Sequence, residues 1–211
     1  MLANPKLFRR KLTECITPYI IMNMEGNINL KCISLFSKPA NTVKPVAKVS
    51  LVDLYKLITG DKYKEVTEEL RGFENPNVKR EYKNTNFDFF TGAGIFPYRA
   101  DDALKYHSGY IVIDLDHLDG VLTETMAKLI TDDNLPVLLM FVSPSGNGLK
   151  VIYGIDLSQG GHRKWFKAIS NYLRETYNLE ADPSGINVSR TCFLAHDPEC
   201  YVCKEIKELI V

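Results

Sequence analysis

The sequence has no excess charge of either sign and no long apolar run. Its 26 Lys and Arg residues balance 26 Asp and Glu residues, which excludes a global basic field for nucleic acid and leaves only a local basic stripe. The strongest apolar run, residues 135–142, is far too short to span a bilayer. The basic residues between Lys6 and Lys11 are not followed by an apolar segment, which argues against a signal peptide. These features predict a soluble, cytoplasmic protein.

Cysteine is scarce and odd in number, which is typical of free thiols rather than of a disulfide framework. The five cysteines are Cys15, Cys32, Cys192, Cys200 and Cys203. Cys200 and Cys203 have C-x-x-C spacing and lie near Cys192 and His196, so a zinc site is one interpretation. Structural zinc sites usually pair two such knuckles across a longer loop, and the second knuckle is missing. We therefore favour packed thiols.

Several binding motifs are also missing. The Gly-Lys-Ser/Thr sequence of a Walker P-loop does not occur. The histidines, at positions 107, 117, 162 and 196, form no His-x-His pair, which argues against a rolling-circle nuclease. Residues 150–154 contain one tyrosine and lack the stacking aromatics of an RNA-recognition strand. The evidence for function therefore lies in polar clusters at the ends of predicted strands.

The hydrophobic periodicity predicts a mixed α/β (α+β) fold. In the first half we expect a strand over residues 30–36, a helix that begins at the N-cap pair Ser50 and Asp53 and ends at Gly60, and a charged helix over 61–72. In the second half we expect strands at 110–115, 137–142, 150–155 and 191–195, with helices at 122–130 and 165–177. This β-α-β-β-α-β order is typical of an RNA-recognition-like or ferredoxin-like palm sheet with helices on one face. Residues 1–211 would form a single domain, with an N-terminal α/β extension (1–104) and the palm (105–205).

Asp114 and Asp116 are the first candidate site residues, at the end of the 110–115 strand. Side chains two residues apart on a strand project from the same face, and two carboxylates this close raise each other's pKa unless a cation neutralises them. The pair is therefore a natural ligand for Mg²⁺ or Mn²⁺, which prefer oxygen. The alternative is that Asp ends the strand and caps a helix. His117 is expected to cap the strand end or to orient Asp116.

A glycine-rich turn over residues 143–150 is the second candidate. Gly146 and Gly148 let backbone N–H groups approach phosphate oxygens, while Ser145 adds a hydroxyl donor and Lys150 a point charge. The alternative is a simple hairpin turn with a flanking lysine. The turn therefore predicts a phosphate site only in combination with the carboxylates.

The third candidate is Asp182, in the connection before the last predicted strand, with Arg190 to steady a phosphate. An Asp-Pro turn with a surface arginine is the alternative. Lys83 and Arg99 are candidates for tracking template phosphates, although charged loops are usually only solvated. If the three segments converge on one sheet face, three carboxylates can hold two divalent ions that bridge phosphates and assist in-line displacement.

The Asp-x-Asp pair, the glycine turn ending at Lys150, and Asp182 resemble, in this order, the three motifs of the archaeo-eukaryotic primase superfamily. The resemblance is closer to the N-terminal domain of virulence-protein-E-like proteins from bacterial mobile elements, and it covers roughly residues 30 to 203. Further segments that resemble this family are 94–96 with Arg99, 107–109, and 189–193 with Asp197 and Pro198.

This resemblance implies a primase-polymerase domain in DNA replication that performs two-metal nucleotidyl transfer. Asp114, Asp116 and Asp182 would carry the metals, and the 145–150 turn would hold the nucleoside triphosphate. A DNA template or primer would be a partner, and relatives are often fused to a helicase-like ATPase. The superfamily usually has histidine where this chain has Lys150, but a lysine still donates to phosphate. Two alternatives stay open: a nucleotide- or nucleic-acid-binding module of the same fold without catalysis, and a metal-dependent phosphohydrolase.

Overall fold

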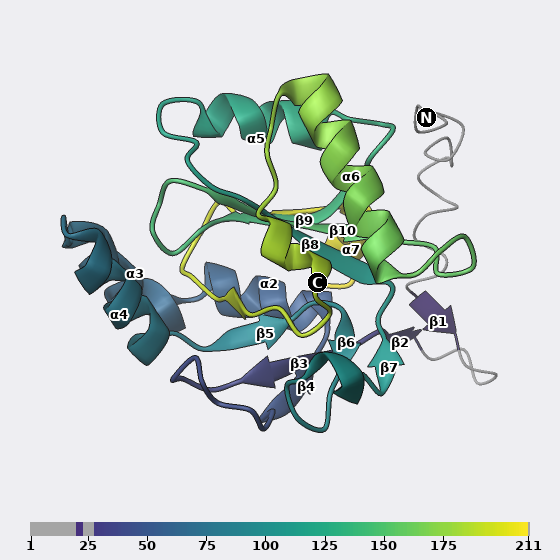
Figure 1. The fold of residues 1–211 in the computed structure, drawn as a ribbon, viewed down its shortest axis with the longest axis horizontal. Helices are drawn as coiled ribbons and strands as arrows, with labels where there is room; N and C mark the ends of the chain where they lie inside the picture. Colours follow the sequence, from purple (N-terminus) through teal and green to yellow (C-terminus); the bar gives the residue numbers. More distant parts are fainter. Residues whose placement is uncertain (1–19, 23–27, 211) are drawn as a thin grey trace.

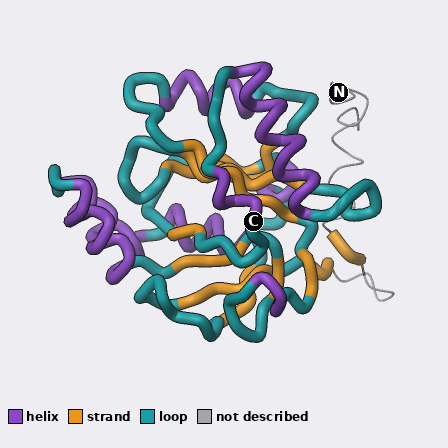
Figure 2. Tube along the Cα trace, viewed as in Figure 1, coloured by secondary structure: helices purple, strands orange, loops and turns teal. Residues whose placement is uncertain are grey.

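A computed structural model describes residues 20–22 and 28–210, so the basic segment at the start of the chain and Cys15 lie outside the described part. The fold is of the mixed α+β class, as predicted, with antiparallel sheets and helices around them (Figures 1 and 2). Two four-stranded sheets make up most of the strand structure.

The first sheet carries the site. Its strands are β8 (Tyr110–Leu115), β9 (Val137–Val142), β10 (Leu149–Gly154) and β12 (Tyr201–Val202), in the spatial order β12-β9-β10-β8. Helices α5 (Leu122–Ile130) and α6 (His162–Tyr177) lie over one face of this sheet (Figure 1). The predictions for β8, β9, β10, α5 and α6 are confirmed to within three residues.

The predicted last strand of this sheet is wrong. Residues 191–195 do not join it, because β11 (Cys192–Phe193) pairs with β5 (Phe89–Thr91) in the second sheet. The fourth position is taken by β12, which pairs with β9 at the opposite edge from β8. The edge of β8 stays free for the segment that carries Asp182.

The second sheet has the order β11-β5-β3-β4 and contains β3 (Ile33–Phe36) and β4 (Ala47–Val49). The strand predicted at 30–36 is interrupted, since β2 (Ile28–Leu30) pairs with β1 (Ile20–Met22) in a separate ribbon. A second ribbon joins β6 (Gly94–Ile95) to β7 (Tyr106–His107).

Helix α2 (Leu51–Thr59) begins at the predicted capping box, in which Ser50 and Asp53 each bond the other's backbone N–H. The second predicted helix is a 3-10 turn, η2 (Asp61–Tyr63), followed by α3 (Lys64–Gly72). Helix α4 (Pro76–Asn86) was not predicted, because none of its side chains is buried and it lacks an apolar face. Helices α3 and α4 form an arm at the left of Figure 1.

The remaining short elements are η3 (Asp101–Ala103), η4 (Pro183–Ile186) and α7 (Lys204–Lys207). Among the described residues, no helix is long and apolar enough to cross a membrane.

The two faces of the first sheet belong to different apolar cores. Ile113 and Val151 face α5 and α6, where they contact the cluster that contains Phe166. Val112 and Ile152 belong to the other face, where α2 and the second sheet complete the core. Because side chains alternate along a strand, this arrangement fixes the direction of every residue of β8 and β10.

Candidate metal and phosphate site

The pairing of β8 with β10 brings Asp114 and Lys150 together. Asp114 lies directly opposite Lys150 in the antiparallel register, as Val112 lies opposite Ile152. Both pairs therefore project from the face that turns away from α5 and α6. Lys150 forms an ion pair with Asp114 and is only 7% exposed. The predicted phosphate lysine is thus held against the first predicted metal ligand.

Backbone hydrogen bonds along the free edge of β8 bring Asp182 beside Asp114. Ala181 forms an isolated antiparallel bridge with Leu115, and the Asp182 N–H donates to the Asp114 carbonyl at 2.9 Å. Asp182 then caps η4, where its carboxylate accepts from the N–H and the hydroxyl of Ser184 at 2.9 and 2.6 Å. The predicted Asp-Pro turn and the predicted convergence on β8 therefore occur together.

The three predicted carboxylates form one cluster. One oxygen from each of Asp114, Asp116 and Asp182 lies within 4.8 Å of the other two. Asp116 is exposed, whereas the other two are partly buried. Lys150 pairs with Asp114, and Arg190 Nη2 lies 2.8 Å from an oxygen of Asp182. This grouping of oxygen ligands is the kind that hard divalent cations prefer.

The charged groups of the cluster have pKa values shifted in different directions. Burial raises the pKa of Asp114; Lys150 opposes the rise, and Asp116 and Asp182 add to it. Burial favours the neutral amine of Lys150, but Asp114 outweighs this effect and raises the pKa of Lys150. For Asp182, hydrogen bonds from Ser184 and nearby cations outweigh burial and lower the pKa. Additional positive charge would therefore stabilise the Asp114 carboxylate most.

The glycine turn packs directly against the end of β8. Ser143 N–H donates to the Gly148 carbonyl at 2.8 Å, and Gly146 has a left-handed φ of +85°. A Cβ on Gly148 would lie 2.5 Å from the Leu115 carbonyl oxygen and 3.3 Å from Cα of Asp116. Only glycine lets the turn come this close, so Gly148 has a packing reason beside the predicted phosphate one.

The turn is tied to the α3–α4 arm and contains a buried hydroxyl. Arg71 of α3 donates to the carbonyls of Ser143 and Pro144 at 3.4 and 3.3 Å, which ties the turn to the α3–α4 arm. Ser143 is 4% exposed, and its Oγ has no hydrogen-bond partner in the described part of the chain. A buried hydroxyl without a partner costs free energy unless a ligand satisfies it.

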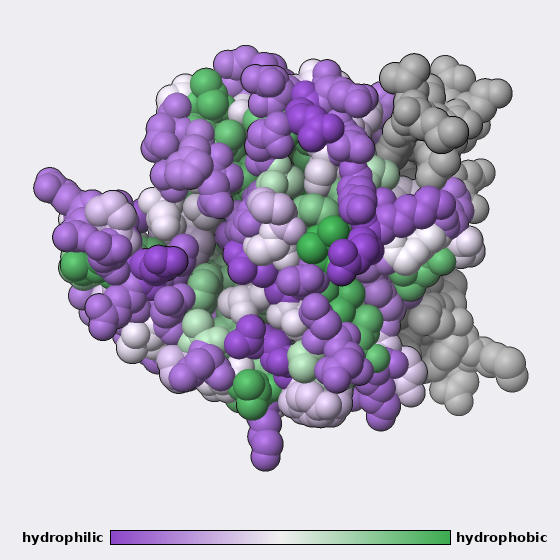
Figure 3. Space-filling model, in the orientation of Figure 1, coloured by the Kyte–Doolittle hydropathy of each residue, from purple (hydrophilic) through white to green (hydrophobic). Residues whose placement is uncertain are grey.

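The carboxylates and the turn line one cavity of about 360 Å³. Its wall consists of Ala40, Arg80, Lys83, Asn84, Asp114, Asp116, Ser143, Pro144, Ser145, Lys150, Asp182, Arg190, Thr191 and Phe193. The space-filling view shows the surface recessed between the α3–α4 arm and the rest of the domain (Figure 3). The cavity is therefore lined both by the three carboxylates and by basic side chains from α4, β10 and the segment before β11.

Two of these basic side chains come from α4. Arg80 and Lys83 are three residues apart, so they share a helix face, and both line the cavity. Burial and the charge of Lys150 lower the pKa of Lys83, whereas the carboxylates oppose this shift. Lys83 Nζ lies 5.6 Å from the centre of the Phe193 ring. Lys83 was a predicted phosphate contact, and Arg80 is an addition that only the structure reveals.

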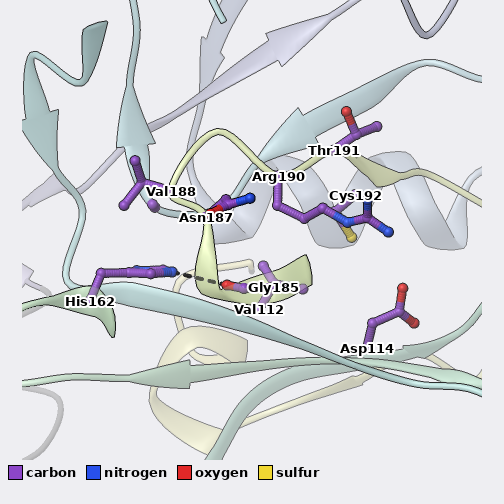
Figure 4. A pocket seen from close by; sticks show the side chains of 11 residues that line it. Val112, Asp114, His162, Gly185, Asn187, Val188, Arg190, Thr191 and Cys192 are labelled. Atoms are coloured by element: carbon purple, nitrogen blue, oxygen red, sulfur yellow. Dashed lines mark hydrogen bonds between the residues drawn. The ribbon is translucent and has the colours of Figure 1, made fainter. Parts of the chain in front are cut away.

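The residues present fit a divalent cation. Asp114 Oδ1 is buried and has no hydrogen-bond partner in the described part of the chain, while Lys150 occupies the other oxygen. The nearby carboxylates supply further oxygen ligands and no nitrogen or sulfur, which favours Mg²⁺ or Mn²⁺ over zinc. A second cavity, lined by Asp114, Val112, Gly185 and Arg190 among others, measures only about 20 Å³ (Figure 4) and is too small for a nucleotide.

A third cavity, of about 440 Å³, shares Asp116 and Asp182 with the first. Its lining contains no lysine or arginine, whereas the cavity of about 360 Å³ combines all three carboxylates with basic side chains. The cavity of about 360 Å³ is therefore the candidate ligand site.

Most predicted site residues meet in this cavity. Seven of them line it directly: Lys83, Asp114, Asp116, Ser145, Lys150, Asp182 and Arg190. Gly146 and Gly148 shape the turn behind them. Sequence reasoning missed Ser143, Arg71 and Arg80. The spacing of Arg80 and Lys83 was a usable signal, whereas the contacts of Arg71 depend on tertiary structure.

Arg99 was predicted as a phosphate contact, and the structure places it elsewhere. Its guanidinium donates to the carbonyls of Ala40 and Thr42 and to the hydroxyl of Thr191, at 2.8 to 3.4 Å. It also lies 5.3 Å from the centre of the Phe89 ring. Arg99 therefore joins loops within the fold.

Of two further predictions, the one for His117 is not met and the one for the cysteines is confirmed. His117 is exposed, with a left-handed φ of 60°, and no hydrogen bond joins it to Asp116 in the described residues. Cys192, Cys200 and Cys203 are buried in the apolar core that contains α2, as expected for packed thiols. Burial raises the pKa of the Cys192 thiol to about 12.

Comparison with known proteins corrects the family assignment. A family model described as "BT4734-like, N-terminal domain" matches residues 82–202, more than half of the chain. No curated protein and no solved structure matches the chain. The resemblance to virulence-protein-E-like and primase proteins is therefore wrong at the family level, and the partners expected from it alone, such as a helicase-like ATPase, lose their basis.

Proposed function

Because the chain belongs to the family of BT4734-like N-terminal domains, whose description states no activity, we propose a function from the site itself. We propose that the cavity binds a nucleoside triphosphate together with Mg²⁺ or Mn²⁺ and that the domain catalyses metal-dependent nucleotidyl transfer to a DNA strand.

One observation carries this proposal. Three carboxylates with ligand atoms within 4.8 Å of one another share a cavity of about 360 Å³ with four basic side chains, Arg80, Lys83, Lys150 and Arg190. Polyphosphate bound through divalent cations needs both charges at once, since carboxylates hold the cation and basic groups contact the remaining phosphate oxygens. Asp114 and Asp182 are already in ion pairs with Lys150 and Arg190, but Asp114 Oδ1 has no hydrogen-bond partner among the described residues, which leaves an oxygen for a cation.

Each group has a chemical task in this proposal. Asp114, Asp116 and Asp182 hold the cation, whose chemistry is to neutralise developing phosphate charge and to orient the reacting oxygens. Lys150, fixed by its ion pair, places a positive charge beside the reacting phosphate. Ser143 lines the cavity, and in this proposal its hydroxyl, which has no partner among the described residues, donates to a phosphate oxygen.

The sheet of β8, β9 and β10 with α5 and α6 would act as the palm of this catalytic domain. In this proposal it is an RNA-recognition-like palm, in which β10 lies between β8 and β9. The support is that the ends of β8 and β10 supply Asp114, Asp116 and Lys150 from one face. The α3–α4 arm then supplies basic groups from outside the palm.

A second candidate is nucleotide binding without catalysis. Lys150 occupies Asp114 Oδ2, so a cation at this carboxylate has only Oδ1 available unless the ion pair opens. A site that keeps this pair closed would bind the phosphates and hold at most one well-ligated cation. The number of bound cations therefore separates the two candidates.

Calorimetric titration of dATP with Mn²⁺ tests the proposal. Wild type should bind, and Asp114→Asn/Asp116→Asn should lose binding, because the cation loses two carboxylates. Asp119→Asn is a matched control, since Asp119 lies in the same loop but outside the cluster. Absence of Mn²⁺-dependent binding in wild type overturns the proposal.

Product analysis with a labelled DNA primer follows. Primer extension supports transfer, release of free nucleotide and phosphate indicates a hydrolase, and binding with no product supports the second candidate.

A further inference from the structure

Two histidines outside the cavity form a hydrogen-bonded chain that ends at the turn after Asp182. His107 Nε2 lies 3.1 Å from His162 Nδ1, and His162 Nε2 lies 3.2 Å from the carbonyl oxygen of Gly185 (Figure 4 shows the last contact). His107 belongs to β7, just before β8, and His162 is the first residue of α6. These hydrogen bonds therefore join three segments that are far apart in the sequence.

The direction of every hydrogen bond in this chain follows from its first member. Gly109 N–H donates to His107 Nδ1 at 3.0 Å, so this nitrogen carries no proton. Neutral His107 must then carry its proton on Nε2 and donate to His162 Nδ1. His162 in turn carries its proton on Nε2 and donates to Gly185. One arrangement satisfies all four groups, and both imidazoles are neutral in it.

The hydrogen-bonded chain of histidines ends at Gly185, in the η4 turn that Asp182 caps. Gly185 is buried in η4, and a Cβ there would lie 2.7 Å from the Phe166 ring and 3.4 Å from the Val112 carbonyl oxygen. Gly185 N–H donates to the carbonyl of Asp182 at 3.1 Å. A displacement of η4 is therefore transmitted to the carboxylate that caps it.

We propose that His107 and His162 are positioning residues that hold η4 against α6 and so keep the Asp182 carboxylate in ligand position beside Asp114. Residues 107–109, to which the sequence analysis gave no role, would thereby act on the cation site from a distance. This inference rests on the proposed function where it concerns the cation, but not where it concerns the turn.

The first test substitutes His162. His162→Phe keeps a ring and removes both hydrogen bonds, whereas His162→Gln keeps an N–H donor for Gly185. His196→Phe is the matched control, because His196 Nδ1 bonds the Gly60 carbonyl at 2.9 Å, a bond of the same kind elsewhere in the fold. Affinity for Mn²⁺ alone is measured by electron paramagnetic resonance of the free ion. We expect an affinity loss of about tenfold in His162→Phe, the lower end of losses for groups that orient metal ligands, with substantial recovery in His162→Gln. His196→Phe should lower thermal stability and leave Mn²⁺ affinity unchanged.

The second test does not depend on the cation. Amide hydrogen exchange at Ser184, Gly185 and Asn187, which donate within η4, should accelerate in His162→Phe and stay at the wild-type rate in His196→Phe. Nitrogen-15 spectra at pH 7 should show both His107 and His162 with the proton on Nε2.

Wild-type exchange rates at these amides in His162→Phe overturn the positioning role. If the turn loosens but wild type itself does not bind Mn²⁺, the proposed function and the cation part of this inference fail, and the turn-holding role stands. If wild type binds Mn²⁺ and the turn loosens without loss of affinity, Asp182 is not held for the cation and the inference fails.

Discussion

Two carboxylates of this domain, the buried Asp132 and the partly buried Asp114, have opposite surroundings. Asp132, at the end of α5, accepts hydrogen bonds from the hydroxyls of Tyr172 and Tyr177 and from the backbone N–H groups of Asn134 and Leu135. Its oxygens are therefore filled by neutral donors. This is how a carboxylate is accommodated when its role is to join α5 to α6.

Asp114 is partly buried and is surrounded by charge. Its partner is Lys150, its Oδ1 has no hydrogen bond within the described residues, and Asp116 and Asp182 lie beside it. The comparison teaches that burial alone does not mark a functional carboxylate. An incomplete hydrogen-bond shell together with like-charged neighbours does, because that arrangement lowers stability unless a ligand completes it.

The largest expected effect comes from replacing the buried ion pair by apolar groups. Asp114→Leu/Lys150→Met should lose dATP–Mn²⁺ binding by at least about 100-fold, since the cation loses its most buried ligand. Its free energy of unfolding should be unchanged or higher by about 1–4 kcal/mol, because apolar replacement of a buried ion pair is often neutral or stabilising. Calorimetry and urea denaturation measure the two quantities. If the double variant binds dATP and Mn²⁺ with wild-type affinity, the contrast between Asp114 and Asp132 fails.

Replacing Asp132 should lower stability and leave dATP binding unchanged. Asp132→Ala leaves two tyrosine hydroxyls and two backbone N–H groups without their acceptor, so we expect a loss of about 3 kcal/mol in the free energy of unfolding. Binding of dATP per folded molecule should not change. The exposed neighbour provides the control, since Asp133→Ala should stay within about 0.5 kcal/mol of wild type. Weaker dATP binding in Asp132→Ala would show that this carboxylate is not purely structural.

The histidine chain predicts a pH dependence of stability. Burial, followed by His162 and Lys31, lowers the pKa of His107 from 6.5 to about 4, and burial also lowers the pKa of His162, although Gly185 and Asp101 oppose this shift. Between pH 6.5 and 4 the unfolded chain binds more protons than the folded one, so stability is present above this window and falls as the pH falls through it.

The His107 contribution should amount to about 1–2 kcal/mol once partial solvent screening is included. Urea denaturation from pH 7 to pH 4.5, compared with His107→Gln, isolates it. The variant should show a smaller decline toward acid than wild type. Parallel declines in the two proteins contradict the assignment.

The smallest effect concerns the free hydroxyl of Ser143. Ser143→Ala should weaken dATP binding about fivefold, equivalent to one neutral hydrogen bond, without loss of stability, because that hydroxyl has no partner within residues 20–22 and 28–210. Ser170, on α6, also has a buried hydroxyl without a partner in this part of the chain, but it does not line the cavity. Ser170→Ala should therefore leave dATP affinity unchanged. Equal affinities for all three proteins would remove Ser143 from the phosphate site.

Periodicity and capping predicted the local structure well wherever an apolar pattern existed. The limits of β8, β9 and α5 and the Ser50 capping box follow directly from residue spacing. Helix α4 was missed because it has no buried side chain, and the last strand of the first sheet was misplaced because β11 is only two residues long. Two residues hold no information about which sheet they join.

The candidate site was also partly predictable. Asp114 and Asp116 follow from strand alternation, and the Asp182 turn follows from its Asp-Pro sequence. Arg99 was misassigned, because a guanidinium can bond carbonyls as well as phosphates, and the sequence does not show which acceptors are near.

By itself, the sequence determined which residues share a strand face and where the chain turns, because these properties depend on neighbours within a few positions. Only the tertiary structure decided that Lys150 pairs with Asp114, that α4 supplies Arg80 to the cavity and that His162 contacts the Gly185 carbonyl in the turn after Asp182. Those contacts join residues far apart in the chain, and they depend on sheet register and on the packing of separate elements. Charge and spacing along the chain do not encode either.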